Sequence, residues 1–300
     1  MAHGFHSGEL AVQRRAGVLD GAARVGGSSR REIPPAAQAF LEQRRWVVLA
    51  TMAPGGRPWA SILTGQPGFA SSPTPATVRI DAAPLPGSPL AESLGHAPFA
   101  GLLAMDLATR RRMRINGRLE GGAASPITIL VDQAYSNCPK YIQRRPLEGG
   151  AAPGPPLLRR RAEALDDRQR AWIRRADTFF IATTHPGEGA DASHRGGLPG
   201  FVRVEGERLV WPDYAGNMMF NTLGNLAVYP RAGLAFPDFG SGAVLHVTGR
   251  AAILWEPPQV SGVPGAERLV TLDVEEVVEL EGVLPPVAEV DYSPFNPPAA

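Results

Sequence analysis

The chain has 300 residues, of which 44% are hydrophobic and 20% charged, and its formal net charge is +1. This length allows one large domain or two ordinary ones, and the balance excludes a disordered chain and a nucleic-acid-binding protein driven by bulk charge. The single cysteine, Cys138, excludes an intramolecular disulfide and a zinc site built from cysteines alone.

The sequence contains no pattern typical of a transmembrane helix or of a signal peptide. No apolar run approaches the roughly 18 residues that a membrane helix needs. The first ten residues lack the basic and then apolar pattern of a signal peptide. We therefore expect a cytoplasmic protein that binds neither membrane nor nucleic acid.

Glycine and proline, 34 and 30 residues, are dispersed between short apolar runs, which predicts many short strands and turns. Helices are expected at residues 8–24, 35–45, 157–176 and 216–226, where apolar residues recur at helical spacing. In chain order, the predicted strands are residues 47–51, 57–63, 101–105, 113–117, 127–131, 179–183, 209–214, 233–236, 244–249 and 268–280. The arginine runs at 110–112 and 159–161 are expected to form solvated faces.

Two blocks of the sequence repeat at one fixed offset. Residues 47–70 align with 179–202 at an offset of 132, with 10 identities in 24 positions. Residues 97–118 align with 229–250 at the same offset, with 7 identities in 22. A constant offset of this length predicts two homologous small domains rather than a solenoid. We expect a mainly β protein with accessory helices, divided into a helical arm (1–35), a first barrel (36–145), a linker (146–157) and a second barrel with a C-terminal tail (158–300).

The two halves differ where the second strand of each ends. The first half has Ile62 and Leu63 there, and the second half has His194 and Arg195. Arginine offers forked donors and glycine exposes backbone N–H groups, so this segment suits an anion. The alternative is a solvated hairpin tip. The residues concerned are Asp191, Ser193, His194, Arg195, Gly196 and Gly197.

A second cluster follows the strand at 209–214. Trp211 and Tyr214 are flat aromatic side chains, and Asp213 lies between them. A helix that opens at Gly216 and Asn217 would bind phosphate through its free N–H groups. Asn217, Asn221 and Asn225 would then share one helix face and could read a polar heterocycle, whereas the alternative is an ordinary amphipathic helix.

The third cluster is the segment Asn137-Cys138-Pro139-Lys140, which holds the only cysteine and the only lysine. A lone cysteine is usually a small buried hydrophobe, so a structural or cofactor-contact role is favoured over covalent catalysis. Lys140 suits a phosphate or the negative charge of a reduced cofactor. No metal site is expected, because His185 and His194 are nine residues apart on a turn and a strand.

Four segments carry a family resemblance: RRWVVLATMAPGGRPWASILTGQPGF, ASHRGGLPGFVRV, LVWPDYAGNMMFNTLGNLAVYPRAGLAF and HVTGRAAILW. Together they resemble the pyridoxamine 5′-phosphate oxidase-like family of FMN-binding split barrels over most of residues 36–255. In that family two barrels pack as a dimer and hold FMN in the groove between them. The resemblance implies two split β-barrels packed as a pseudo-dimer within one chain, with residues 191–203 and 211–217 along the flavin.

The family's oxidase has a basic Ser-Arg-Lys run at the helix start, whereas this chain has Gly216-Asn217-Met218. We therefore expect the phosphate to rely on Ser193, Arg195, Arg203 or Lys140. The full set of expected cofactor-binding residues is Asp191, Ser193, His194, Arg195, Gly196, Gly197, Arg203, Trp211, Asp213, Tyr214, Gly216, Asn217, Asn221, Asn137 and Lys140.

The expected function is that of an FMN-binding oxidoreductase, which transfers a hydride or electrons between a small organic molecule and a reduced nicotinamide or another electron donor. His194 is the candidate proton donor, because the reference pKa of histidine lies near neutrality, but a structural hydrogen bond is equally open. The alternative function is a non-catalytic module that binds or senses flavin, haem or deazaflavin, and FAD is a further alternative cofactor. We expect one flavin site per chain, and homodimer formation remains open.

Overall fold

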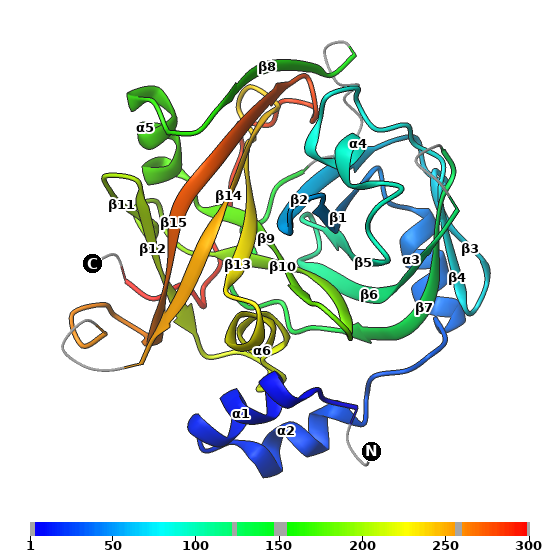
Figure 1. The fold of residues 1–300 in the computed structure, drawn as a ribbon, viewed down its shortest axis with the longest axis horizontal. Helices are drawn as coiled ribbons and strands as arrows, with labels where there is room; N and C mark the ends of the chain where they lie inside the picture. The colour runs from blue at the N-terminus through cyan, green and yellow to red at the C-terminus, as the bar shows by residue number, and fades with distance from the viewer. Residues whose placement is uncertain (1–3, 122–124, 147–154, 256–259, 299–300) are drawn as a thin grey trace.

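The computed structural model describes residues 4–121, 125–146, 155–255 and 260–298. Two antiparallel sheets make up most of it (Figure 1). The first has the order β2-β1-β5-β6-β7-β4-β3, and the second has the order β10-β9-β13-β14-β15-β12-β11. The expected fold class, two split β-barrels with accessory helices, is confirmed.

The ten strands predicted by range are present, as is the strand expected to end at His194 and Arg195, which is β10, and β3, β4, β8 and β11 are additional. The strands are β1 (Trp46–Ala53), β2 (Arg57–Thr64), β3 (Ala70–Thr74), β4 (Thr77–Ile80), β5 (Phe99–Asp106), β6 (Arg111–Glu120), β7 (Ile127–Ser136), β8 (Leu157–Ala162), β9 (Thr178–His185), β10 (Gly189–Gly196), β11 (Arg203–Glu205), β12 (Arg208–Tyr214), β13 (Arg231–Asp238), β14 (Ala243–Leu254) and β15 (Ala266–Glu281).

The pairing registers of the two sheets coincide at the offset found in the sequence. Ala50 pairs with Gly101 in the first sheet, and Ala182 pairs with Gly233 in the second. Each sheet also has a β-bulge at the matching place, after Asn116 in β6 and after Thr248 in β14. Strand order, register and bulge therefore agree between the halves.

The halves pack through matching glycines. A Cβ on Gly101 of β5 would lie 2.7 Å from the backbone nitrogen of Ala192 in β10. A Cβ on Gly233 of β13 would lie 2.2 Å from the carbonyl oxygen of Pro58 in β2. Each half thus lets the other half's hairpin approach its own backbone, which produces an intrachain pseudo-dimer.

Three large hydrophobic clusters follow this arrangement. One lies in each barrel, and the third joins residues of both, among them Trp46 and Phe180, whose ring centroids are 5.6 Å apart. Burial of apolar area contributes about 25 cal/mol per Å², so the shared cluster stabilises the pairing of the barrels as well as each barrel.

The helices are α1 (Ser7–Arg15), α2 (Leu19–Gly26), α3 (Pro35–Glu42), α4 (Pro89–Ser93), α5 (Asp167–Arg175) and α6 (Asn221–Val228). The helix expected at 35–45 is confirmed as α3. The helix expected at 8–24 is two helices, α1 and α2, which are separated at Gly17 with a φ of +71°. Figure 1 shows both of them beside α6. No helix in the described part of the chain is long and apolar enough to cross a membrane.

The helix expected at 157–176 is wrong in its first part. β8 occupies that part and pairs with β15, and only then does α5 begin, after a capping box at Asp166. The free backbone groups along the edge of β15 pair with residues 157–162 and hold them as a strand. The helical spacing of the side chains in this segment does not indicate that pairing. Residues 147–154 of the expected linker lie outside the described residues.

Candidate functional site

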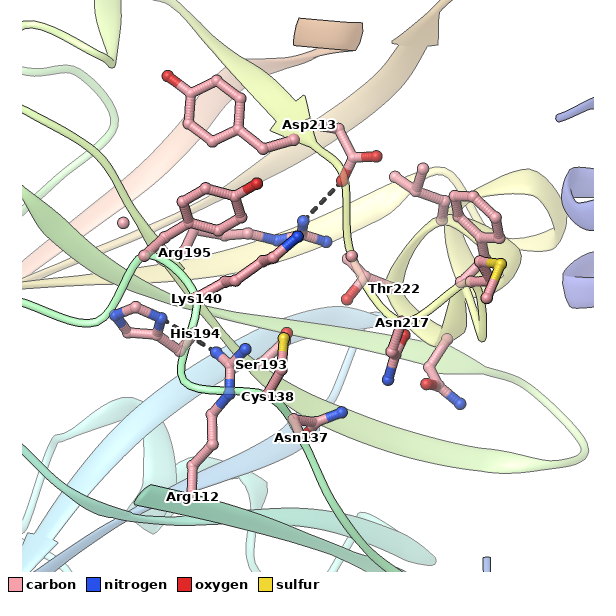
Figure 2. A pocket seen from close by; sticks show the side chains of 18 of the residues that line it. Arg112, Asn137, Cys138, Lys140, Ser193, His194, Arg195, Asp213, Asn217 and Thr222 are labelled. Carbon is pink, nitrogen blue, oxygen red and sulfur yellow. Dashed lines mark hydrogen bonds and ion pairs between the residues drawn. The ribbon is translucent and has the colours of Figure 1, made fainter. Parts of the chain in front are cut away.

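A cavity of about 810 Å³, open to solvent on one side, lies where the two halves meet (Figure 2). We call it the cationic cavity. The first half contributes β6 and the segment that follows β7, and the second half contributes β10, the end of β12 and residues 216–223.

Most of the residues expected at the cofactor lie together in the wall of this cavity. They are Asn137, Lys140, Ser193, His194, Arg195, Gly196, Asp213, Tyr214, Gly216, Asn217 and Asn221. Gly197, Arg203 and Trp211 lie outside it. The Gly197 carbonyl accepts from Gln143, Arg203 is exposed beside Glu205, and Trp211 is buried in the core of the second barrel.

Asp191 lies beneath the wall and acts through a neighbour. It is buried, and the guanidinium of Arg114 lies 3.3 Å from its carboxylate. The Tyr135 hydroxyl donates to the same carboxylate at 3.2 Å. Arg114 also donates to the hydroxyl of Ser193, which lines the cavity. Asp191 therefore orients Arg114 rather than lining the cavity itself.

Arg112 and Arg114 are the functional candidates that sequence reasoning missed. They alternate along β6, so both side chains leave the strand on the same face. The expectation that Arg112 lies on a solvated face is wrong, because its Nε is buried in the cavity wall. Burial and the neighbouring Arg114 lower the pKa of Arg112 to about 10, so it stays a cation at neutral pH.

Some of the cationic side chains at the cavity are paired with a carboxylate and others are not. Asp213 forms an ion pair with Arg195, which is the dashed line between them in Figure 2. The two groups are 2.6 Å apart, and Asp213 also lies 3.3 Å from Arg268. Among the described residues, Arg112 and Lys140 have no carboxylate oxygen within 4 Å. The cavity therefore carries uncompensated positive charge.

His194 is a buried, neutral ring. Its Nδ1 lies 3.1 Å from the Arg112 guanidinium, and because an arginine only donates, Nδ1 is the acceptor. Burial, followed by the charge of Arg112 and other arginines, holds the pKa of His194 well below its usual value of 6.5. A charged proton donor at neutral pH is disfavoured here, and the geometry favours the structural hydrogen bond.

The asparagine face expected on a helix from residue 216 is not formed. Met218 and Phe220 have φ values of +63° and +61°, which an α-helix does not allow, so α6 begins only at Asn221. Asn217 instead accepts from the backbone of Met219. Asn217 and Asn221 line the cavity, and Asn225 bonds to a threonine behind it.

Backbone strain also concentrates at the cavity. Of the non-glycine residues with positive φ in the described part of the chain, Tyr141, Met218 and Phe220 all line it. Such conformations cost about 1–3 kcal/mol each and persist where the surroundings impose them. Gly196 contributes in another way, because a Cβ there would lie 2.0 Å from the Tyr141 carbonyl oxygen. This glycine lets the first half's segment lie close over β10.

The side chains fit a flat, phosphorylated cofactor such as FMN. Polar atoms with no hydrogen-bond partner in the described structure gather in this wall: Arg112 Nε, Arg114 Nε, Asn137 Oδ1, His194 Nε2 and Arg195 Nε. Since buried polar groups are normally paired, their concentration in one wall points to a polar ligand. Tyr141 and Tyr214, with ring centroids 5.1 Å apart, add a flat aromatic wall.

The family model described as pyridoxamine 5′-phosphate oxidase matches residues 165–282. No curated protein sequence matches the chain. Similar solved structures include HupZ from Group A Streptococcus, at 12% identity and a TM-score of 0.33, covering 40% of this chain and 98% of that one. A FAD-binding protein from Mesorhizobium loti has 15% identity and a TM-score of 0.29, covering 41% and 96%. An F420 reductase has 12% identity and a TM-score of 0.28, covering 42% and 98%. Residues 165–282 are therefore similar to the pyridoxamine 5′-phosphate oxidase family, as the sequence resemblance leads us to expect.

Proposed function

We propose that the cationic cavity binds FMN and that the chain is a flavin-dependent oxidoreductase acting on a small organic molecule. The observation that carries this proposal is the meeting of Arg112 and Lys140, neither of which has a carboxylate partner in the described structure, in a cavity built by both halves. A phosphate monoester carries up to two negative charges and accepts forked hydrogen bonds, so it matches these two cations.

The residues divide the work of binding. Arg112, Lys140 and Arg195 supply donors for the phosphate. Asn137 supplies an amide with an unpartnered oxygen for the polar edge of the ring system, and Tyr214 supplies an aromatic face. A bound flavin provides hydride or electron transfer, while the protein positions it and excludes competing reactions.

The protein's contribution to the chemistry is electrostatic. Arg112 remains charged at neutral pH and lies in a buried wall, where a charge acts more strongly than in water. It stabilises negative charge that develops nearby during reduction. The neutral His194 holds the Arg112 guanidinium in place by accepting its hydrogen bond.

A non-catalytic flavin-binding module is the second candidate, and one observation favours it. Burial holds His194 neutral and raises the pKa of Tyr214 to about 12, so neither of them offers a group that titrates near pH 7. Binding without turnover is consistent with such a wall.

The deciding experiment begins with the absorbance spectrum of the purified full chain and mass spectrometry of any released cofactor. The apoprotein is then titrated with FMN, FAD and a deazaflavin, and the complex is mixed anaerobically with NADH or NADPH. FMN binding followed by rapid bleaching supports the oxidoreductase. Binding without reduction by either donor favours the module, and a colourless protein that leaves the FMN spectrum unchanged contradicts both.

A further inference from the structure

A second cavity, of about 580 Å³, lies beside the cationic cavity, and the two share Phe201, Pro212 and Tyr214 in their walls. We call it the apolar cavity. We propose that it binds the planar, apolar body of an organic substrate, an aromatic molecule that is neutral or carries one acidic group. This inference rests on the proposed function, because it assigns the substrate of the same site.

The lining of the apolar cavity sets this class. Trp211 and Leu269 are almost completely buried and line the cavity, and proline rings form much of the rest of the lining. Among the described lining residues, Arg203 is the only charged side chain; it is 49% exposed and lies 3.6 Å from Glu205. A polyanion or a strongly polar molecule would find few hydrogen-bond or ionic partners in this cavity. An aromatic ring would contact apolar side chains, and one acidic group on it could reach Arg203.

The walls are held in place by contacts from distant parts of the chain. Ser293 and Asn296 donate to the Gln143 side chain at 2.8 and 3.0 Å, which fixes the C-terminal tail to the first half. A Cβ on Gly265 would lie 2.6 Å from the ring of Pro297, so the turn at 263–265 presses against this tail. Both the turn and the tail line the cavity. The cavity is therefore built by tertiary contacts.

The two cavities that share this wall differ in charge, so they suit different ligands. Phosphate suits the cationic side, where Arg112 and Lys140 lie, and an apolar ring suits the other side. A substrate in the apolar cavity would meet a flavin in the cationic cavity across Phe201, Pro212 and Tyr214. The competing occupant is the adenine ring of FAD, which has the same flat shape.

The test uses 1-anilinonaphthalene-8-sulfonate, an aromatic probe with one sulfonate, and the full chain both with and without saturating FMN. Leu198→Trp narrows the apolar cavity, which Leu198 lines. Leu158→Trp is the matched control, because Leu158 is 38% exposed on β8 and lines neither cavity. Val263→Trp provides a second way to fill the apolar cavity, and thermal unfolding checks that each variant folds.

We expect one saturable probe site, which persists when FMN is bound. Leu198→Trp or Val263→Trp should raise the Kd of the probe about tenfold or more, and the control Leu158→Trp should leave it unchanged. FMN affinity stays within about twofold in all variants. The proposal is overturned if FMN displaces the probe, or if neither filling variant changes the Kd of the probe. It is also overturned if the filling variants weaken FAD binding but leave FMN binding unchanged, because the cavity would then hold the adenine ring. Probe binding that responds to the filling variants in a protein that never binds FMN retains the aromatic-ligand site and refutes only the proposed function.

Discussion

Arg112 is the residue on which the cationic cavity most depends. Its guanidinium is buried beside Arg114 and donates a hydrogen bond to the neutral ring of His194. Burying a charge without a counter-charge is costly, and the cost is relieved when an anion arrives. Arg112 therefore couples ligand affinity to the stability of the ligand-free protein.

Replacing Arg112 with glutamine should weaken FMN binding about 10- to 100-fold, because one charge-assisted contact is worth about 1.5–3 kcal/mol. The ligand-free variant should unfold at the same temperature as the parent or at a higher one, since an uncompensated buried charge is removed. Fluorescence titration and thermal unfolding measure the two effects. Arg118→Gln, at an exposed arginine paired with Asp132, is the control. Unchanged FMN affinity in the Arg112 variant would remove the phosphate assignment.

Glu9 is a second buried ionisable residue, held against α6 by the N-terminal helix α1. It accepts from Asn221 at 2.7 Å, and Asn221 lines the cationic cavity. Burial, reinforced by Asp191 and Glu188, raises the pKa of Glu9 to about 8. Burial, reinforced by His185, lowers the pKa of the neighbouring His6 to about 4. The two side chains lie 3.6 Å apart, and the opposite shifts of their pKa values favour the neutral form of each at pH 7.

The raised pKa of Glu9 predicts that stability falls as pH rises from 6.5 to 8. The unfolded chain releases this proton near pH 4.5, whereas the folded protein keeps it to about pH 8. His6 and His246, with pKa values near 4, produce the opposite trend, but only below about pH 6.5. The expected loss between pH 6.5 and 8 is about 2 kcal/mol in urea unfolding. Glu9→Gln should remove most of it, and a slope unchanged from that of the control Glu163→Gln, at an exposed glutamate that does not contribute to the shift, would refute the assignment.

At the scale of elements, strands were predictable and helix boundaries were not. Apolar and β-branched runs located the ten strands, because a buried sheet requires such side chains. The expected helix at 157–176 failed at β8, whose backbone partners lie in β15, about 120 residues away in sequence. The expected helix start at Gly216 failed because Met218 and Phe220 are left-handed, a conformation that their residue types rarely adopt.

Gly196 in β10 is expected to be irreplaceable for cofactor binding. Gly196→Ala places a Cβ 2.0 Å from the Tyr141 carbonyl oxygen and must push away the segment that carries Lys140. We expect stability to fall by about 1–3 kcal/mol, as for other overpacked sites, and FMN affinity to fall about tenfold or more. Chemical unfolding and FMN titration measure both. Gly187→Ala, where no atom of the described residues lies within 4 Å of the added Cβ, should change neither. Full FMN affinity in the Gly196 variant would show that the close approach does not position Lys140.

The pairing of the two halves explains why the sequence predicted only the second half's part of the cationic cavity. The repeat at offset 132 pointed to the second half's polar strand end, and those residues do line the cavity. The cavity also needs β6 and the segment after β7 of the first half, and no local pattern indicates which side chains of one half meet those of the other. Arg112 appeared as part of an arginine run, and its burial arises only from the pairing of the two barrels.

The same pairing predicts one FMN per chain. The positions that match His194, Arg195 and Arg112 at the offset of 132 are Ile62, Leu63 and Val244, all apolar and buried. Ile62 and Val244 pack in one hydrophobic cluster with Val283 and Leu284, from the segment after β15 that matches the first half's segment after β7. Apolar side chains therefore fill much of the second groove, and these three positions offer no donor to a phosphate there. Isothermal titration of the full chain with FMN should give a stoichiometry near one. A stoichiometry of two, or an Arg112→Gln variant that keeps one tight site, would mean that the apolar groove also binds flavin and that the halves are functionally equivalent.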